Sequence, residues 1–215
     1  MKNVYIYCEG QTEESFVNEV LYPYFLNMSI VVSPIVCQTK RTTSKKYTGG
    51  VSDYLKIKKE LTMICKGHRH EHVTTMSDYY KMPVNTPSID CNEPDIRKRM
   101  KIIEAAINAD IGEANCNFHF MLHEFEAILF SSPKSFYLIA DDETVDKIQQ
   151  IRDSYQTPEH INNSVEMAPS KRLETLIPRY AKIKNGTLLA KDMGIDCILE
   201  QCPHFREWVE AIIAY

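Results

Sequence analysis

The chain of 215 residues carries 25 basic and 29 acidic side chains, which gives a net charge of −4. This length suits a single domain with an extension, and a hydrophobic fraction of 44% is enough to build a buried core. The weakly acidic balance excludes a globally basic nucleic-acid-binding protein, so a role on nucleic acid would need a local basic patch.

Two further features narrow the class of protein. No apolar run approaches the roughly 18 residues of a membrane span, and the first residues lack the hydrophobic stretch of a signal peptide. The seven cysteines form no CxxC pair and show no zinc-finger spacing. We therefore expect reduced thiols, a cytoplasmic location and no membrane partner.

Strand-like and helix-like patterns alternate in the first part of the chain. Runs of β-branched and aromatic residues predict strands, and apolar positions at helical spacing predict the helices between them. Pro34 indicates a bend or an edge position in the second strand. The expected elements are a strand at 3–8, a helix from Thr12, a strand at 29–37, a helix at 52–66, a strand at 72–76, a helix at 95–109, a strand at 117–122 and a short helix at 123–130.

This order predicts an α/β fold of the Rossmann-like kind, with a parallel sheet flanked by helices. From Pro133 onward the pattern is helical, in short amphipathic pieces separated by prolines and glycines. We therefore expect an α/β domain over residues 1–132 and a helical C-terminal extension over residues 133–215, packed on the same domain.

Acidic residues follow three of the predicted strands. Glu9 follows the first strand, Asp78 follows the third, and Glu124 and Glu126 follow the fourth. Because parallel strands all end at one edge of the sheet, where ligands bind in such folds, these carboxylates should meet there. Like charges gathered in one place favour a divalent cation among them, and Mg²⁺ or Mn²⁺ suits oxygen ligands.

Each of these residues also has a purely structural interpretation. A single acid at a strand end commonly caps the next helix, and Glu126 could face solvent. His123 could be a metal ligand or a general base, or a histidine hydrogen-bonded in the rim of the sheet. The coincidence across three strands, rather than any one residue, favours a site.

Two local basic clusters could contact a nucleic-acid backbone. The first follows the second strand and contains Lys40, Arg41, Lys45 and Lys46. The second lies at a predicted helix start and contains Lys171 and Arg172, where backbone N–H groups can also contact phosphate. Charge runs of this kind also occur as ordinary solvated loops.

The residues just described carry a resemblance to a known family. The stretch YCEGQTEESFVNEVLYPYF resembles the start of Toprim-type nuclease domains, where a glutamate follows the first strand. Over nearly its full length the chain resembles a bacterial Toprim-like family catalogued as domain of unknown function 4276. The stretches that carry it are EGQTEESFV, GGVSDYLKIKKEL, VTTMSDYYKMP, ADIG, LHEFEAILF, PEHINNSVEMAPSKRL and CPHFREW.

The resemblance implies a magnesium-dependent phosphotransfer site in a Toprim-like sheet, as in nucleases of the overcoming-lysogenisation type. Glu9 matches the strand-one glutamate, the expected general acid or base, and Asp78 matches the first aspartate of an Asp-x-Asp motif. Tyr80 replaces the second aspartate, so Glu124 or Glu126 is expected to supply the missing acid. Relatives also resemble parts of antiphage defence loci, often beside an ATPase, which implies an ATPase partner by association.

Three functions follow as hypotheses. The first is a metal-dependent nuclease acting on DNA or RNA, as the effector of an antiphage system. The second is a non-catalytic Toprim-like module that acts as the partner of an ATPase, and the third is phosphoester chemistry on a small molecule. The chain has no GxxxxGK[ST] loop and no GxGxxG motif, which argues against a P-loop ATPase and a dinucleotide enzyme.

Overall fold

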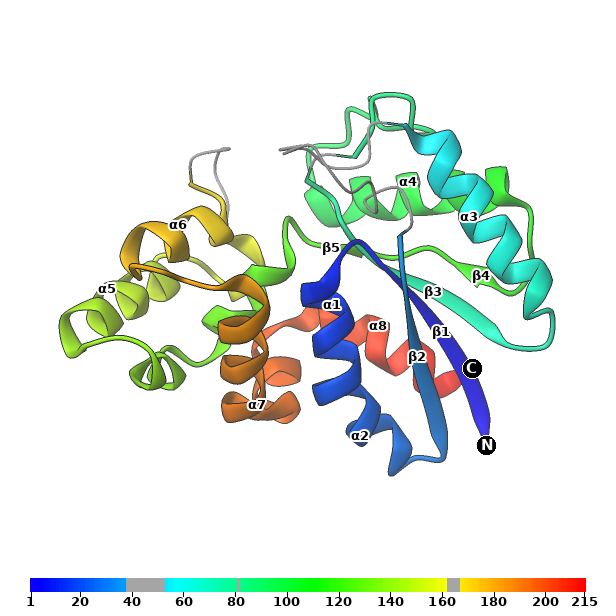
Figure 1. The fold of residues 1–215 in the computed structure, drawn as a ribbon. Coiled ribbons are helices and arrows are strands. Elements are labelled where there is room, and N and C mark those ends of the chain that lie inside the picture. The colour runs from blue at the N-terminus through cyan, green and yellow to red at the C-terminus, as the bar shows by residue number, and fades with distance from the viewer. Residues whose placement is uncertain (38–52, 81, 162–166) are drawn as a thin grey trace, which may run out of the picture.

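A parallel sheet forms the centre of the computed structural model, which describes residues 1–37, 53–80, 82–161 and 167–215. The strand order is β2-β1-β3-β4 (Figure 1). The short β5 also pairs with β3, closer to the carboxyl end of β3 than β4 does. The expected α/β, Rossmann-like class is confirmed, and β2, with its proline, lies at an edge as expected. The strands are β1 (Lys2–Cys8), β2 (Ile30–Val36), β3 (His72–Asp78), β4 (Cys116–Asn117) and β5 (Phe120–Met121).

Helices connect the strands and build the C-terminal part of the chain. The first connection is a continuous helical run with a π-helical turn just before Pro23, whose missing N–H and bulky ring disturb regular α-helical bonding. The helical elements are α1 (Gln11–Phe16), η1 (Val17–Leu21), α2 (Tyr22–Leu26), α3 (Tyr54–Gly67), α4 (Ile96–Ile111), η3 (Phe125–Ser131), η4 (Pro133–Leu138), α5 (Asp142–Asp153), η5 (Pro158–His160), α6 (Pro169–Leu176), α7 (Lys182–Gln201) and α8 (Pro203–Ala214).

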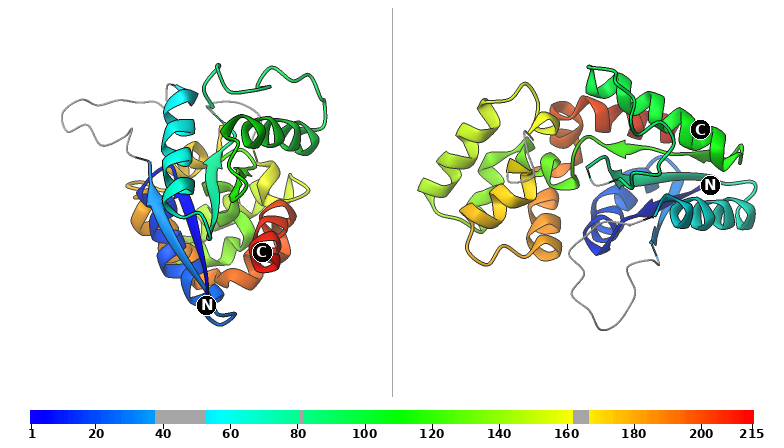
Figure 2. Two further views of the ribbon diagram at one scale, coloured as in Figure 1. Left: turned by 90° about the vertical axis from the view of Figure 1, so that its right-hand side faces the viewer. Right: turned by 90° about the horizontal axis from the view of Figure 1, so that it is seen from above.

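Helices cover both faces of the sheet. Because successive strand residues point to opposite sides, each strand contributes side chains to both faces. From β1, Val4 and Ile6 pack into a core shared with α1, α2 and α8, whereas Tyr7 packs into a second core with α3 and α4. Burial on both faces explains why the strand reads as a nearly continuous apolar run. The sheet is therefore a central layer between two layers of helices (Figure 2).

The helices α5, α6 and α7 form a lobe beside the sheet, beyond the carboxyl ends of its strands (Figures 1 and 2). The chain then returns, and α8 packs across the sheet. There the indole Nε1 of Trp208 donates to Thr74 Oγ1 on β3 at 2.9 Å. The first core contains buried side chains from β1 and from α7 and α8, so the C-terminal extension packs on the same hydrophobic core as the sheet.

Two predicted strands differ from those observed. The third strand extends to Asp78 instead of ending at Met76. The expected continuous strand at 117–122 is wrong, because it is divided into β4 and β5. Between them, the buried Thr75 hydroxyl donates to the His119 carbonyl at 2.7 Å and accepts from the His119 amide at 2.8 Å. A side chain thus replaces the backbone ladder at this point, which the alternating sequence pattern does not reveal.

We expect Thr75→Val to destabilise the fold by about 1–3 kcal/mol, because the isosteric valine leaves the buried amide and carbonyl of His119 without these partners. Thr75→Ser keeps the hydroxyl and serves as the matched control. Urea unfolding followed by circular dichroism measures both variants. Equal stability of Thr75→Val and the wild type would show that the hydroxyl does not hold this segment.

Candidate functional site

The carboxyl ends of β1 and β3 bring two acids from distant parts of the chain into contact. Cys8 pairs with Met76 in the sheet, and each strand carries its acid just beyond this pair. The backbone amide of Asp78 donates to Glu9 Oε1 at 3.1 Å. The first two of the expected site residues therefore lie side by side at one edge of the sheet.

The segment after β5 joins the same edge. Met121 pairs with Asp78, and the amide of Phe125, the first residue of η3, donates to Asp78 Oδ1 at 3.0 Å. Between them the chain bends sharply at His123, whose φ of 73° lies in the left-handed region. A non-glycine residue seldom adopts this conformation, and such strain is concentrated at functional sites.

Glu124 and Glu126 are buried beside this bend, with only 4% and 5% of their surface exposed. Glu124 Oε2 accepts a hydrogen bond from the amide of Ser170 in α6 at 3.2 Å. Glu126 Oε1 lies 3.1 Å from the ammonium group of Lys182 at the start of α7. The C-terminal lobe thus contacts both acids, and Glu126 does not face solvent.

A fifth acid, Glu13 in α1, is also largely buried. Its carboxylate lies over Gly10, where an added Cβ would sit 3.4 Å from Glu13 Oε2. We call Glu9, Glu13, Asp78, Glu124 and Glu126 the carboxylate cluster. Sequence reasoning missed Glu13, although its position in the first turn of the helix that follows Glu9 is a signal. It also missed Lys182, for which the sequence gives no signal.

The electrostatics of the cluster follow from its composition. Burial, reinforced by the negative charges of the four neighbouring glutamates, raises the pKa of Asp78 well above its usual range. Burial likewise raises the pKa of Glu126, although the ammonium group of Lys182 opposes this shift. Burial works against the charge of Lys182, but the adjacent Glu126 carboxylate raises the pKa of this lysine overall.

The chemistry of this donor set suits a hard divalent cation, although among the described residues no three of these acids bring their ligand atoms within 4.8 Å of one another. The side chains of the cluster offer oxygen ligands, which Mg²⁺ and Mn²⁺ prefer, and a positive ion would relieve their mutual repulsion. A metal held this way can polarise a phosphoryl oxygen or activate a bound water. The residues that could hold it are Glu9, Asp78 and Glu124, with Glu126 partly neutralised by its ion pair.

His123 lies next to the cluster, in surroundings that disfavour its charged form. Burial, followed by the nearby His160, lowers the pKa of His123 to about 4, while Glu124 opposes the shift. A neutral imidazole can accept a proton or bind a metal. The structure therefore leaves both expected roles open to this residue.

The basic residues expected to contact nucleic acid have different surroundings. Lys40, Arg41, Lys45 and Lys46 lie outside the described residues. Lys171 forms an ion pair with Glu174 on the surface of α6. Arg172 donates to the carbonyl of Met167 and to the hydroxyl of Tyr155, which ties part of its guanidinium to the local fold. Both residues follow Ser170, so they lie close to the cluster.

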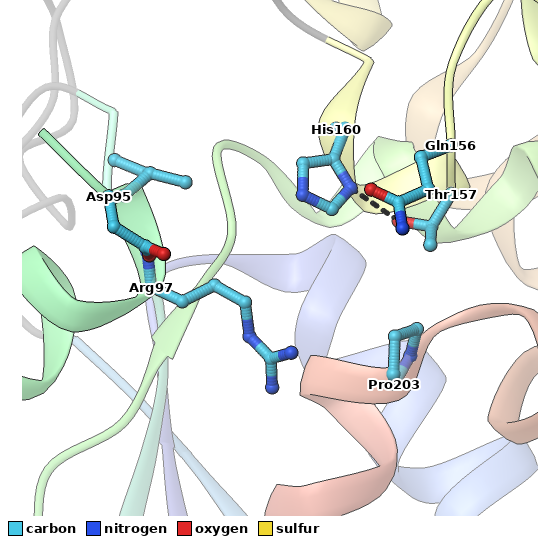
Figure 3. Close-up of a pocket in the computed structure, with 7 residues that line it drawn as sticks. Asp95, Arg97, Gln156, Thr157, His160 and Pro203 are labelled. Atoms are coloured by element: carbon cyan, nitrogen blue, oxygen red, sulfur yellow. Dashed lines mark hydrogen bonds between the residues drawn. The ribbon is translucent and has the colours of Figure 1, made fainter.

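A cavity of about 390 Å³ opens between the start of α4, the segment around η5 and the start of α8. Figure 3 shows the Arg97 guanidinium and the His160 ring on opposite sides of it, with His160 hydrogen-bonded to Thr157. No pattern in the sequence indicates this cavity. Its lining residues are Asp95, Ile96, Arg97, Gln156, Thr157, His160 and Pro203.

A second group of side chains could hold a metal ion away from the carboxylate cluster. Glu104, His119 and His204 each offer one ligand atom, and these atoms lie within 4.8 Å of one another. Burial raises the pKa of Glu104 to about 7 and lowers the pKa of both histidines. Sequence reasoning missed this group, because its members are far apart in the chain.

We expect Asp78→Asn to raise the free energy of unfolding by about 1 kcal/mol when divalent metals are removed by a chelator. The asparagine keeps an oxygen that can accept from Phe125 but removes a charge that its surroundings repel. Because the folded state raises the pKa of Asp78, the wild type loses stability as the pH rises from the ordinary aspartate pKa of about 3.9 to the raised pKa of the folded state. The advantage of the variant should therefore grow over this range.

Chemical denaturation at several pH values measures this difference, and the exposed Asp146→Asn on α5 is the control. Added Mg²⁺ should reverse the order, because it stabilises only the chain that binds it. A variant that is less stable than the wild type without metal would contradict the repulsion described here.

No helix in the described parts of the chain has both the length and the apolar character that crossing a membrane requires.

Comparison with known proteins identifies the family of this chain. No curated protein and no solved structure matches the chain significantly. The family model described as domain of unknown function (DUF4276) matches residues 8–213, and the chain therefore belongs to this family.

Proposed function

We propose that the chain is a metal-dependent phosphodiester hydrolase of the Toprim type, which cleaves DNA or RNA with Mg²⁺ or Mn²⁺. The observation that carries this proposal is the hydrogen bond from the Asp78 amide to the Glu9 carboxylate, together with the nearby Glu124 carboxylate, whose charge helps to raise the pKa of Asp78. Three acids that converge there are costly to the fold unless they serve a ligand. A divalent cation is the ligand that their oxygens suit best.

In this proposal Glu9, Asp78 and Glu124 would hold the ion, and Glu126 would be a further candidate ligand. The metal would supply Lewis-acid chemistry to a phosphoryl oxygen. Glu9 is the general acid or base, in line with its match to the strand-one glutamate of Toprim domains. Lys182 offsets part of the negative charge of the cluster. This reduces the electrostatic repulsion of a phosphate that approaches the site.

Glu124 takes the role of the second aspartate that Tyr80 replaces. The amide of Tyr80 donates to the carbonyl of His123 at 3.2 Å. The residue that follows this carbonyl is Glu124, and its carboxyl contributes to the raised pKa of Asp78. In this proposal Glu124, from the segment after β5, supplies the carboxylate that position 80, just after β3, lacks.

Nucleic acid would approach over the start of α6. Lys171 and Arg172 lie there, one and two residues after the Ser170 amide that contacts Glu124. The basic residues Lys40, Arg41, Lys45 and Lys46 follow β2, a neighbour of β1 in the sheet. Positive side chains near the cluster would position a phosphate backbone over the metal, and Lys171 and Arg172 are the ones that the described part of the chain places there.

The cellular role proposed for this activity is that of an effector in a bacterial antiphage system. Its support is the resemblance to Toprim-like proteins of defence loci, which is an argument from association. The same resemblance supports a neighbouring ATPase as the partner that controls the activity.

A second candidate function is a non-catalytic Toprim-like module that acts as the partner of an ATPase. The specific observation in its favour is that the acids already have partners within the protein. Asp78 accepts from Phe125, Glu124 accepts from Ser170 and Glu126 pairs with Lys182. A site that has decayed would retain these structural contacts after losing its metal.

We expect the purified chain to cleave single- or double-stranded DNA or RNA in the presence of Mg²⁺ or Mn²⁺, and not with a chelator. Glu9→Gln and Asp78→Asn should each lower the rate at least about 100-fold, because they remove a metal ligand or an acid–base group. The exposed Glu143→Gln on α5 is the control and should keep the wild-type rate. Cleavage that persists unchanged in both site variants would sink the proposal.

Titration calorimetry distinguishes the two candidate functions. The nuclease predicts a Mg²⁺ or Mn²⁺ site that Asp78→Asn weakens. The partner module predicts no such site, together with stable association of the chain with its ATPase in size-exclusion chromatography.

A further inference from the structure

Glu104, His119 and His204 come from three separate parts of the fold. Glu104 lies on α4, His119 lies between β4 and β5, and His204 is in the first turn of α8. Their ligand atoms lie within 4.8 Å of one another. The two histidines are buried, with only 8% of His119 and 3% of His204 exposed, and Glu104 is partly buried.

Both imidazoles have a ring nitrogen without a partner. Among the residues that the structure describes, no hydrogen-bonding group reaches Nε2 of His119 or Nδ1 of His204. A buried polar atom left unpaired costs about 1–3 kcal/mol, and native proteins contain few of them. Two such atoms on neighbouring rings leave each histidine able to bind a ligand, while the other ring nitrogen of His119, Nδ1, lies 3.6 Å from Glu104 Oε1.

The hydrogen bonds of His204 and Glu104 favour a metal over a hydrogen-bonding ligand. The Nε2 of His204 lies 2.8 Å from the carbonyl of Phe120, so this nitrogen donates and Nδ1 remains as an acceptor. Metal-binding histidines are usually held in this way, with the second nitrogen bonded to a carbonyl or carboxylate. The amide of Phe120 also donates to Glu104 Oε1 at 2.8 Å, which fixes the carboxylate.

We propose that Glu104, His119 and His204 bind a divalent transition-metal ion, with Zn²⁺ as the ion that fits best. Two imidazoles and one carboxylate form a set that zinc accepts in tetrahedral sites, whereas Mg²⁺ prefers oxygen ligands alone. This site is distinct from the carboxylate cluster in its ligands and in its metal preference. Because its ligands come from α4, the β5 segment and α8, the ion would fasten α8 to the sheet.

The ring geometry gives the proposal a consequence that can be measured. The rings of His119 and His204 are stacked at 4.7 Å with an angle of 24°. Nitrogen lone pairs lie in the plane of each ring, so two nearly parallel rings do not point at one ion. At metal–nitrogen distances of about 2.0–2.1 Å, one of the rings must turn when the metal binds.

The turn should affect Trp208. The indole of Trp208 stacks on His119 at 5.3 Å with an angle of 12°, and it is the single tryptophan of the chain. Intrinsic fluorescence therefore reports on the surroundings of this group without interference from other tryptophans.

The test is a titration of the full-length, chelator-treated chain with Co²⁺ and then Zn²⁺. We expect one equivalent of Co²⁺ to produce visible absorption typical of tetrahedral coordination, a change in Trp208 fluorescence at the same stoichiometry, and displacement of both signals by Zn²⁺. His119→Gln and His204→Gln should weaken binding at least about 100-fold. His70→Gln, which changes an exposed histidine, should leave it unchanged.

Three results would overturn the proposal. The first is a wild-type chain that shows neither signal at metal concentrations up to the millimolar range. The second is unchanged binding in both histidine variants. The third is loss of the signals in Asp78→Asn, which would place the ion at the carboxylate cluster. The wild-type titration decides the question even if a histidine variant fails to fold, and its outcome does not depend on nuclease activity.

Discussion

The mutual repulsion of the carboxylates at the ends of β1 and β3 is the constraint on which the rest of this structure depends. Parallel strands all end at one edge, so Glu9 and Asp78 meet there. The same geometry would place any acid after these strands in the cluster. The fold must therefore offset the charge with bonds from elsewhere, and it does so with backbone amides and a cation from the C-terminal lobe.

The C-terminal lobe is the source of that compensation. The start of α6 donates an amide from Ser170 to Glu124, and the start of α7 brings Lys182 to Glu126. A helix start is favourable near a carboxylate because its free N–H groups carry partial positive charge. Residues 133–215 are thus more than an appendage, since they contact the acids that the sheet assembles. A cation bound in the cluster would neutralise the charge of these carboxylates more completely.

The sequence allowed the sheet and the meeting of Glu9 with Asp78 to be predicted, because strand patterns are local and parallel topology fixes where their ends lie. It did not allow the division of the fourth strand, which depends on a hydroxyl from Thr75 that no periodicity reports. Lys182 was equally inaccessible, since its ion pair forms between elements that no pattern links. Contacts of this kind appear only when the packing of the helices is known.

The segment between β4 and η3 connects the two candidate sites. His119 is held by Thr75, Phe120 is bonded through its amide and carbonyl to Glu104 and His204, and Phe125 donates to Asp78. Side chains rather than a long strand ladder thus fix this segment at several points. Since Glu124 lies within it, the position of this carboxylate depends on those bonds. An ion held by Glu104, His119 and His204 would restrict the motion of this segment. It would thereby help to hold Glu124 in the carboxylate cluster.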